Sequence, residues 1–140
     1  MKSTYGLLRE RCGLSIVEAA AFHHVSDDTV KAWSSGRRKA PDGVIQELRN
    51  LYDTIETAAV NIARMIDDDT GEIELGLAAD DHEAQSIGWP CVGAQAASIG
   101  LAACYLDNDV IIVPRGSTIA TAAAADTHEG HIFDSQRRRR

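Results

Sequence analysis

Two groups of charged side chains with the chemistry of nucleic-acid recognition lie close together in the chain. Asp27 and Asp28 come first, and the basic triplet Arg37-Arg38-Lys39 follows. Arginine and lysine neutralise DNA phosphates, and a carboxylate accepts a hydrogen bond from cytosine N4 in the major groove. Carboxylates in the first turn of a helix also stabilise its macrodipole, typically by about 0.3–1 kcal/mol. We expect one aspartate to serve the helix and the other to face a base.

The segment between Ser15 and Gly36 must position these groups, and its pattern predicts two short helices joined by a tight turn. Ser15 and Glu18 form an S-x-x-E capping box, so the first helix should begin at Ile16. Ser26 caps the second helix, and Gly36 ends it as a C′ glycine does. This order is a helix-turn-helix, whose main use is to place its second helix in the major groove of DNA.

The segment from Ala20 to Gly36 has the pattern A-x-x-x-(turn)-V-S-x-x-x-V-x-x-W-x-x-G. This pattern resembles that of the Cro/CI-type helix-turn-helix repressors. The continuations Ala40-Pro41-Asp42-Gly43-Val44 and Ile87-Gly88-Trp89 resemble a narrower group, the YdiL-like regulators and the anti-CRISPR-associated (Aca) repressors of phages, which carry a C-terminal dimerisation region. One departure is His24, which stands at a turn position usually held by glycine. Histidine is among the residue types enriched at positive φ.

The resemblance implies which side chains contact DNA. The groove-facing residues would be Asp27, Asp28, Thr29, Lys31 and Ala32, while Val30 and Trp33 face inward. Ala32 would meet a thymine methyl group. The backbone N–H groups at Ser15 and Ile16 would hold a phosphate at a helix N-terminus, and Arg37, Arg38 and Lys39 would clamp others. The resemblance further implies a homodimer that binds an inverted repeat and autorepresses a phage or mobile-element operon.

A long helix with an apolar seam is predicted next. Pro41-Asp42 opens it, and no proline or glycine interrupts Val44 to Thr70. The seam repeats at spacings of three and four through Ile45, Leu48, Tyr52, Ile55, Ala59, Ile62 and Ile66. The first half packs either on the preceding helices or on a partner. For the second half we expect an intersubunit or interdomain contact, so Ile55, Ala59, Ile62 and Ile66 are candidate dimer-interface residues.

The C-terminal part is predicted to be a small α+β unit. A strand is expected over Glu72–Leu77, a polar loop over Ala78–Ser86, a buried helix over Pro90–Leu106 and a strand over Val110–Val113, which Pro114 stops. A β-α-β arrangement fits, but so few strands are marginal alone. Pairing across a dimer would solve this, which makes Val110 and Ile112 further interface candidates.

The predicted fold is therefore a mainly α N-terminal helix-turn-helix domain with a small α+β C-terminal dimerisation domain. Its boundaries are 1–66 for the DNA-binding domain with the long helix, 67–114 for the dimerisation domain and 115–140 for a flexible tail. The charge divides in the same way, since residues 1–52 carry +2 and residues 53–140 carry −9 within a net charge of −7. DNA responds to the local field, so the acidic half does not exclude binding.

Other kinds of chemistry find little support. The triplet Asp67-Asp68-Asp69 lacks the glycine and glutamate positions of a calcium loop, and His128 and His131 make a weak metal pair, so we expect no metal, no cofactor and no enzyme activity. No apolar run is long enough to span a membrane and no signal peptide is seen. Three dispersed cysteines suggest reduced thiols in a cytoplasm.

Two alternative functions stay open from the sequence, and so does the role of the terminal arginines. The protein could be an antitoxin whose acidic half binds a toxin, or an interaction module in which residues 72–113 bind a ligand or protein and DNA is secondary. A toxin or RNA partner is therefore unresolved. The terminal run Arg137–Arg140 is either a basic arm that adds phosphate contacts or a solubilising end.

Overall fold

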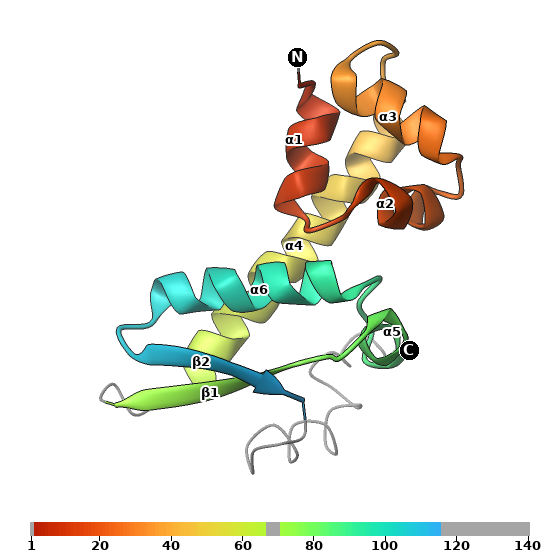
Figure 1. Cartoon of the computed structure of the whole chain (residues 1–140). Coiled ribbons are helices and arrows are strands. Elements are labelled where there is room, and N and C mark those ends of the chain that lie inside the picture. Colours follow the sequence, from red (N-terminus) through yellow and green to blue (C-terminus); the bar gives the residue numbers. More distant parts are fainter. Residues whose placement is uncertain (1, 67–70, 116–140) are drawn as a thin grey trace.

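The computed structural model describes residues 2–66 and 71–115, and within these ranges the fold is mainly helical with a two-stranded sheet (Figure 1). The elements in chain order are α1 (Thr4–Arg11), α2 (Ile16–His23), α3 (Asp27–Ser35), α4 (Asp42–Met65), β1 (Glu72–Leu77), α5 (Asp81–Ser86), α6 (Val92–Tyr105) and β2 (Asp109–Pro114). The predicted tail beyond Arg115, with its histidines and terminal arginines, lies outside the described residues, as does the acidic triplet 67–69.

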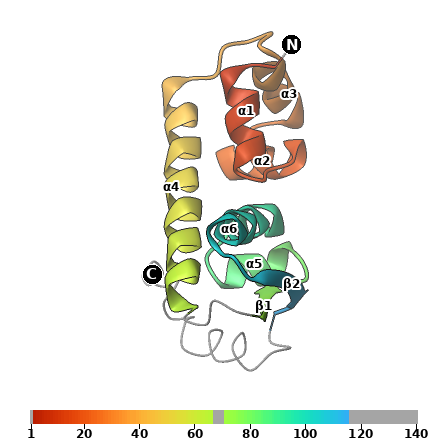
Figure 2. The same ribbon diagram turned by 90° about the vertical axis from the view of Figure 1, so that its left-hand side faces the viewer.

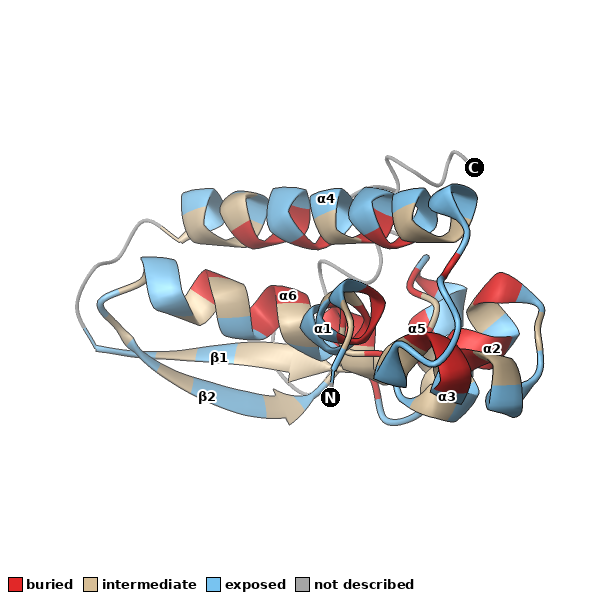
Figure 3. Cartoon of the chain, turned by 90° about the horizontal axis from the view of Figure 1, so that it is seen from above, coloured by how far each residue is buried: buried red, intermediate tan, exposed pale blue. Residues whose placement is uncertain are grey.

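Helix α4 forms the spine of the molecule. The helices α1, α2 and α3 lie beside its first half, and α5, α6 and the two strands lie beside its second half (Figure 2). We call the first group the N-terminal lobe and the second group the C-terminal lobe. The inner face of α4 is buried from Leu48 to Ala59, while its outer face is exposed (Figure 3).

The seam on α4 is covered by the same chain, which corrects part of the predicted dimer interface. Ile55 and Ala59 are both 0% exposed, and α4 packs extensively on α6. These two side chains therefore have no surface left for a partner subunit, and this part of the seam on α4 packs against the C-terminal lobe of the same chain. Ile62 and Ile66, nearer the end of α4, are only half-buried, so their assignment to a dimer interface stays a prediction.

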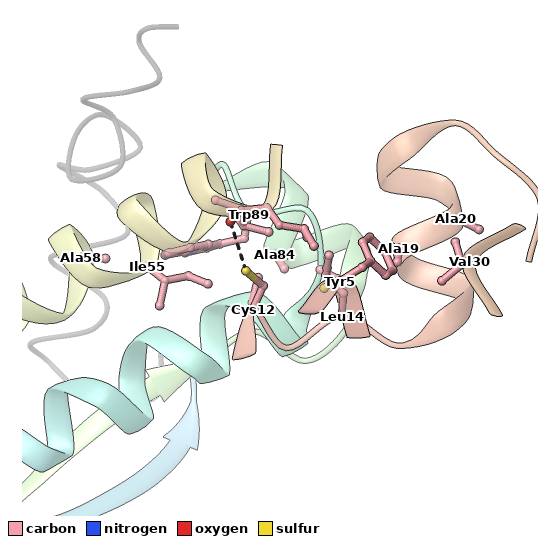
Figure 4. Packing of buried hydrophobic residues seen from close by; sticks show 14 of the residues in the cluster. Tyr5, Cys12, Leu14, Ala19, Ala20, Val30, Ile55, Ala58, Ala84 and Trp89 are labelled. Atoms are coloured by element: carbon pink, nitrogen blue, oxygen red, sulfur yellow. Dashed lines mark hydrogen bonds between the residues drawn. The ribbon is translucent and has the colours of Figure 1, made fainter. Parts of the chain in front are cut away.

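A continuous core joins the two lobes. Buried side chains run from Tyr5 and Leu14 in the N-terminal lobe to Trp89 and Ala94 in the C-terminal lobe as one cluster (Figure 4). The thiol of Cys12 donates a hydrogen bond to the carbonyl oxygen of Leu48 at 3.4 Å within it. Because the core is shared, the lobes support each other's fold.

The two strands form a β-α-β unit within one chain. β1 and β2 pair in parallel, from Glu72 opposite Asp109 to Leu77 opposite Pro114, and the chain crosses between them through α5 and α6. Gln95 on α6 joins helix to strand, since its Oε1 accepts from the Ala78 amide at 2.9 Å and its Nε2 donates to the Gly76 carbonyl. Each strand thus has a neighbour within its own chain, so neither needs a partner subunit in order to pair.

One predicted loop contains a helix. The segment Ala78–Ser86 was expected to be irregular, but α5 occupies Asp81–Ser86. The Asp80 carboxylate accepts from the Glu83 amide at 2.9 Å, and the Glu83 carboxylate accepts from the Ala79 amide at 2.7 Å. This reciprocal capping stabilises a helix that is too short to show apolar periodicity.

Candidate nucleic-acid interface

The turn between α2 and α3 is held by the backbone. Helix α2 has both arms of its capping box, and His24 adopts the left-handed conformation with φ of 62°. The Val25 amide donates to the Ala20 carbonyl at 3.0 Å, which closes the end of α2. His24 therefore performs at this turn the role that glycine usually has, with its side chain exposed.

Helix α3 presents a polar face to solvent and an apolar face to the core. Ser26 caps it by accepting from the Thr29 amide at 3.2 Å. Its exposed residues are Asp27, Asp28, Lys31 and Ser35, and its buried residues are Val30, Ala32 and Trp33. Thr29 is half-buried, and its hydroxyl is hydrogen-bonded to Ser26. Three of the five predicted base-contacting residues, Asp27, Asp28 and Lys31, are thus exposed, and their base contacts stay a prediction, as does that of the half-buried Thr29. The exposed face also includes Ser35, which was not predicted.

The fifth position, Ala32, is corrected by the structure. Its side chain is 0% exposed, and the Arg38 amide donates to the Ala32 carbonyl at 3.1 Å, so the chain folds back on α3 after Gly36. A buried methyl group cannot reach a thymine methyl. Ala32 is therefore a packing residue.

The basic triplet follows directly from this fold-back. Gly36 ends α3 with φ of 84°, and Arg37, Arg38 and Lys39 are all exposed. Within the described residues, none of these three side chains takes part in an ion pair. Together with Lys31, they are exposed cations on and beside the polar face of α3, and no carboxylate of residues 2–66 and 71–115 forms an ion pair with them.

The predicted phosphate contact at the start of α2 is corrected in part. The Ser15 amide donates to the Glu18 carboxylate at 2.9 Å, so it is already occupied. Glu18 also brings a negative charge close to this helix end, and its Oε1 lies near the first turn of α6, 3.7 Å from where a Cβ on Gly93 would be. A phosphate would meet this carboxylate before it met the helix terminus. Ile16 is half-buried, and its phosphate contact stays a prediction.

Two contacts that the sequence did not reveal hold α3 in position. The rings of Tyr5 and Trp33 pack edge-on with centroids 5.5 Å apart. At the end of α3, the Arg9 side chain donates to the Ser34 hydroxyl at 3.1 Å and to the Leu14 carbonyl at 2.7 Å. Arg9 is nearly buried, so this arginine of α1 serves the fold and is not a surface cation.

His23 connects α2 to α4. Its Nδ1 lies 2.7 Å from Oε1 of Glu47, and its ring contacts Tyr5, Phe22 and Trp33. The side chain is fully buried. A signal was present in the sequence, since His23 follows Ala19 and Ala20 at helical spacing on the inner face of α2, but its carboxylate partner is far away in the chain.

The remaining candidate residues lie in the C-terminal lobe. Val110 is half-buried and Ile112 is 49% exposed on β2. In the ranges 2–66 and 71–115 no group of three possible metal ligands gathers, and no helix there has the length and apolar character to cross a membrane.

The site is thus a polar helix face, flanked by exposed cations and held in place by an aromatic cluster. It offers hydrogen-bond donors and acceptors to a surface that is itself polar and anionic. Comparison of the sequence with protein-family models and with curated proteins gives no match.

Proposed function

We propose that the protein is a sequence-specific DNA-binding transcriptional repressor that acts as a homodimer on an inverted-repeat operator. In this proposal α2, the His24 turn and α3 form a helix-turn-helix, with α3 as the recognition helix. Asp27, Asp28 and Lys31 on its exposed face would contact base edges, and the basic triplet would contact phosphates. The motif resemblance to anti-CRISPR-associated repressors supports autorepression of a phage or mobile-element operon.

The observation that carries the proposal is the division of α3 into two faces. Val30 and Trp33 are buried while Asp28 and Lys31 are exposed. The apolar face of α3 therefore holds the helix against the core, and its polar face is open to solvent. The outer face of any surface helix is usually polar, but α3 is followed at once by the exposed cations Arg37, Arg38 and Lys39, which form no ion pair within the described residues. A groove-reading helix needs both features.

The charge distribution fits this assignment. The N-terminal lobe is mildly basic while the rest of the chain is acidic, so the C-terminal lobe would be repelled from the phosphate backbone. DNA is then favoured on the α3 side of the molecule alone. Each dimer would bring two copies of the basic triplet to the duplex.

The test is a binding-site selection with the full chain on randomised duplexes, followed by affinity measurements over a range of salt. We expect an inverted repeat with half-site centres about one helical turn, ~34 Å, apart. Footprinting on the DNA upstream of the protein's own gene should show protection of the same repeat. No enriched sequence, together with the same affinity for all duplexes, would exclude the proposal.

Two variants distinguish residues that recognise bases from residues that bind phosphates. Lys31→Ala should relax preference at particular base pairs, each by about 1–3 kcal/mol if the contact is good. Arg37→Ala should weaken binding to all sequences alike and reduce the slope of log affinity against log salt by about 0.9 per lost phosphate contact. Arg49→Ala removes an exposed cation from α4 instead and serves as the matched control, with no change in preference.

A further inference from the structure

Strand β2 pairs with β1 along one edge, and in residues 2–66 and 71–115 no strand pairs with its other edge at Val110 and Ile112. The Arg115 amide donates to the Leu77 carbonyl of β1 at 3.0 Å, and backbone groups alternate between the two sides of a strand. The amide and carbonyl of Val110 and of Ile112 therefore point away from β1. The described sheet has only two strands, so no strand of the described chain meets these groups.

The middle of this strand, Val110 to Val113, is apolar and uncharged. Val110-Ile111-Ile112-Val113 are four consecutive β-branched residues, and Ile111 and Ile112 are 37% and 49% exposed. β1 differs, since Glu72 and Glu74 are exposed on it. Proteins protect edge strands from association with charges. On β1 the charges lie within the strand, whereas on β2 the charge of Asp109 and the proline Pro114 stand only at the two ends. The middle of β2 therefore lacks that protection, which indicates that another strand covers it.

We propose that the strand covering β2 is β2 of a second copy of the chain, which pairs antiparallel to form a four-stranded sheet in the order β1-β2-β2-β1. This inference deepens the proposed function, because it names the surface through which the two subunits would associate. It uses a chemically self-complementary element, as a symmetric dimer requires.

Symmetry limits the register of the two strands, and we take the register that centres on Ile111. A two-fold axis that relates antiparallel strands of one sheet is perpendicular to the sheet, so one residue must lie opposite its own copy. If that residue is Ile111, Val110 of each copy lies opposite Ile112 of the other and exchanges both backbone hydrogen bonds with it. Four hydrogen bonds result, and they use the open groups on this edge.

The charges agree with this register. Asp109 of one copy lies opposite Val113 of the other, which separates the two Asp109 side chains by about four residues of strand, ~14 Å. Like charges are thus kept apart at the ends of the paired segment, and its centre contains only apolar side chains. Opposing apolar β-branched side chains stabilise a strand pair.

The arrangement of the lobes favours this pairing over a face-to-face dimer. The N-terminal lobe lies on the side of the sheet that α6 covers (Figures 1 and 2). A two-fold axis perpendicular to the sheet keeps both N-terminal lobes on that side, where both copies of α3 can meet one DNA duplex. Packing the uncovered sheet faces against each other would place the lobes on opposite sides.

Cysteine crosslinking tests the register in the full chain. In a Cys104→Ser background, which removes the exposed native thiol, Ile111→Cys places two thiols opposite each other at a non-hydrogen-bonded pair. The Cα atoms of such a pair lie about 4.5 Å apart, within the range for a disulfide. Oxidised glutathione should therefore link most of the chains into covalent dimers. Val113→Cys is the matched control and should not crosslink, because its copies are ~14 Å apart.

A charge variant tests the surface independently. Ile111→Lys should weaken self-association measured by light scattering by roughly tenfold or more, because two apolar side chains are lost and two like charges face each other. Glu74→Lys, on β1 in the pair with Ile111, is the control and should leave self-association unchanged. Circular dichroism checks that each variant folds.

The results that would refute this strand pairing differ from those that would refute the proposed DNA binding. A monomeric wild-type chain at micromolar concentration, or a dimer that Ile111→Lys leaves intact, would overturn this inference even if operator binding were found. A dimer that crosslinks through residue 113 and not through residue 111 would also overturn it. Conversely, a dimer with the expected crosslink and no DNA preference would refute the proposed function alone.

Discussion

Gly13 and Gly93 contact each other backbone to backbone where the two lobes meet. A Cβ on Gly93 would lie 1.9 Å from the carbonyl oxygen of Gly13, and a Cβ on Gly13 would lie 2.1 Å from that of Gly93. Neither residue has room for a side chain, and Gly13 also has a positive φ of 76°. This contact fixes the loop after α1 against the first turn of α6, and so links the lobe that carries α3 to the lobe that carries the sheet.

We expect Gly93→Ala to destabilise the protein by about 1–3 kcal/mol, the usual range for overpacking, because the facing atom is backbone and cannot move alone. In a helix without this contact, the same change would stabilise by up to about 1 kcal/mol. Gly100 on the same helix α6 has nothing within 4 Å of its Cβ position, so Gly100→Ala is the matched control. Urea unfolding of both variants should give opposite signs, and equal signs would show that the close contact does not exist in solution.

The buried thiols predict a loss of stability at alkaline pH. Burial raises the pKa of Cys12 and of Cys91 from 9.0 to about 11, and burial raises the pKa of Tyr5 from 10.0 to about 12. The unfolded chain therefore releases these protons first as the pH rises, and the free energy of unfolding should fall from about pH 9 upward. Urea unfolding at pH 8, 9 and 10 measures this.

A variant isolates the thiol contribution to that slope. Cys91→Ala removes one of the two buried thiols, so the fall between pH 9 and 10 should be smaller than in the wild type, whatever the cost of the substitution at pH 8. Cys104→Ser, which changes the exposed cysteine, serves as the comparison. A slope that Cys91→Ala leaves unchanged would mean that the thiol is not buried in solution.

The contact between His23 on α2 and Glu47 on α4 predicts a loss of stability when its carboxylate is removed. Glu47→Ala leaves the buried Nδ1 of His23 without its partner, since Glu47 Oε1 at 2.7 Å is its hydrogen-bond partner. A buried polar group without a partner costs about 1–3 kcal/mol, so the unfolding midpoint in urea should fall. Glu56→Ala, an exposed glutamate on the same helix, should change it by less than about 0.5 kcal/mol. Equal effects of the two variants would show that His23 is satisfied in another way.

Local signals allowed much of the N-terminal lobe to be predicted from the sequence. The start of α2 at Ile16, the cap at Ser26 and the end of α3 at Gly36 depend on residues within one turn of each position. Such capping interactions act over short distances, so a sequence contains them completely. The parallel β-α-β arrangement was also accessible, because it follows from the order of two strands and a helix.

The tertiary contacts of those elements were harder to predict from the sequence. The seam through Ile55 and Ala59 has the same pattern whether a second subunit or α6 covers it, and periodicity does not identify the covering helix. Ala32 was assigned to the groove from the position of α3 in a motif, while its burial depends on a chain reversal after Gly36. The contact between Gly13 and Gly93 joins residues far apart in the chain, and nothing local predicts it.

Asp28 provides the sharpest test of how α3 would work. It is exposed in the first turn of the helix, beyond the Ser26 cap. If it serves only the helix end, Asp28→Asn should lower stability by less than about 1 kcal/mol and tighten binding to every duplex, because one negative charge is removed from the DNA side. If it accepts from cytosine N4, discrimination at one G·C pair should fall by about 1–3 kcal/mol while the other positions hold.

Asp42→Asn is the matched control for this variant. Asp42 is likewise exposed in the first turn of a helix, on α4, so it reports the effect of losing a charge near a helix start away from α3. Binding-site selection on the wild type and both variants separates the two roles, since only a base-contacting Asp28 changes the preferred sequence at a single position. Loss of discrimination across the whole site in Asp28→Asn, with unchanged stability, would contradict both roles, because neither role acts on positions that Asp28 does not touch. That result would mean that α3 does not lie in the groove as proposed.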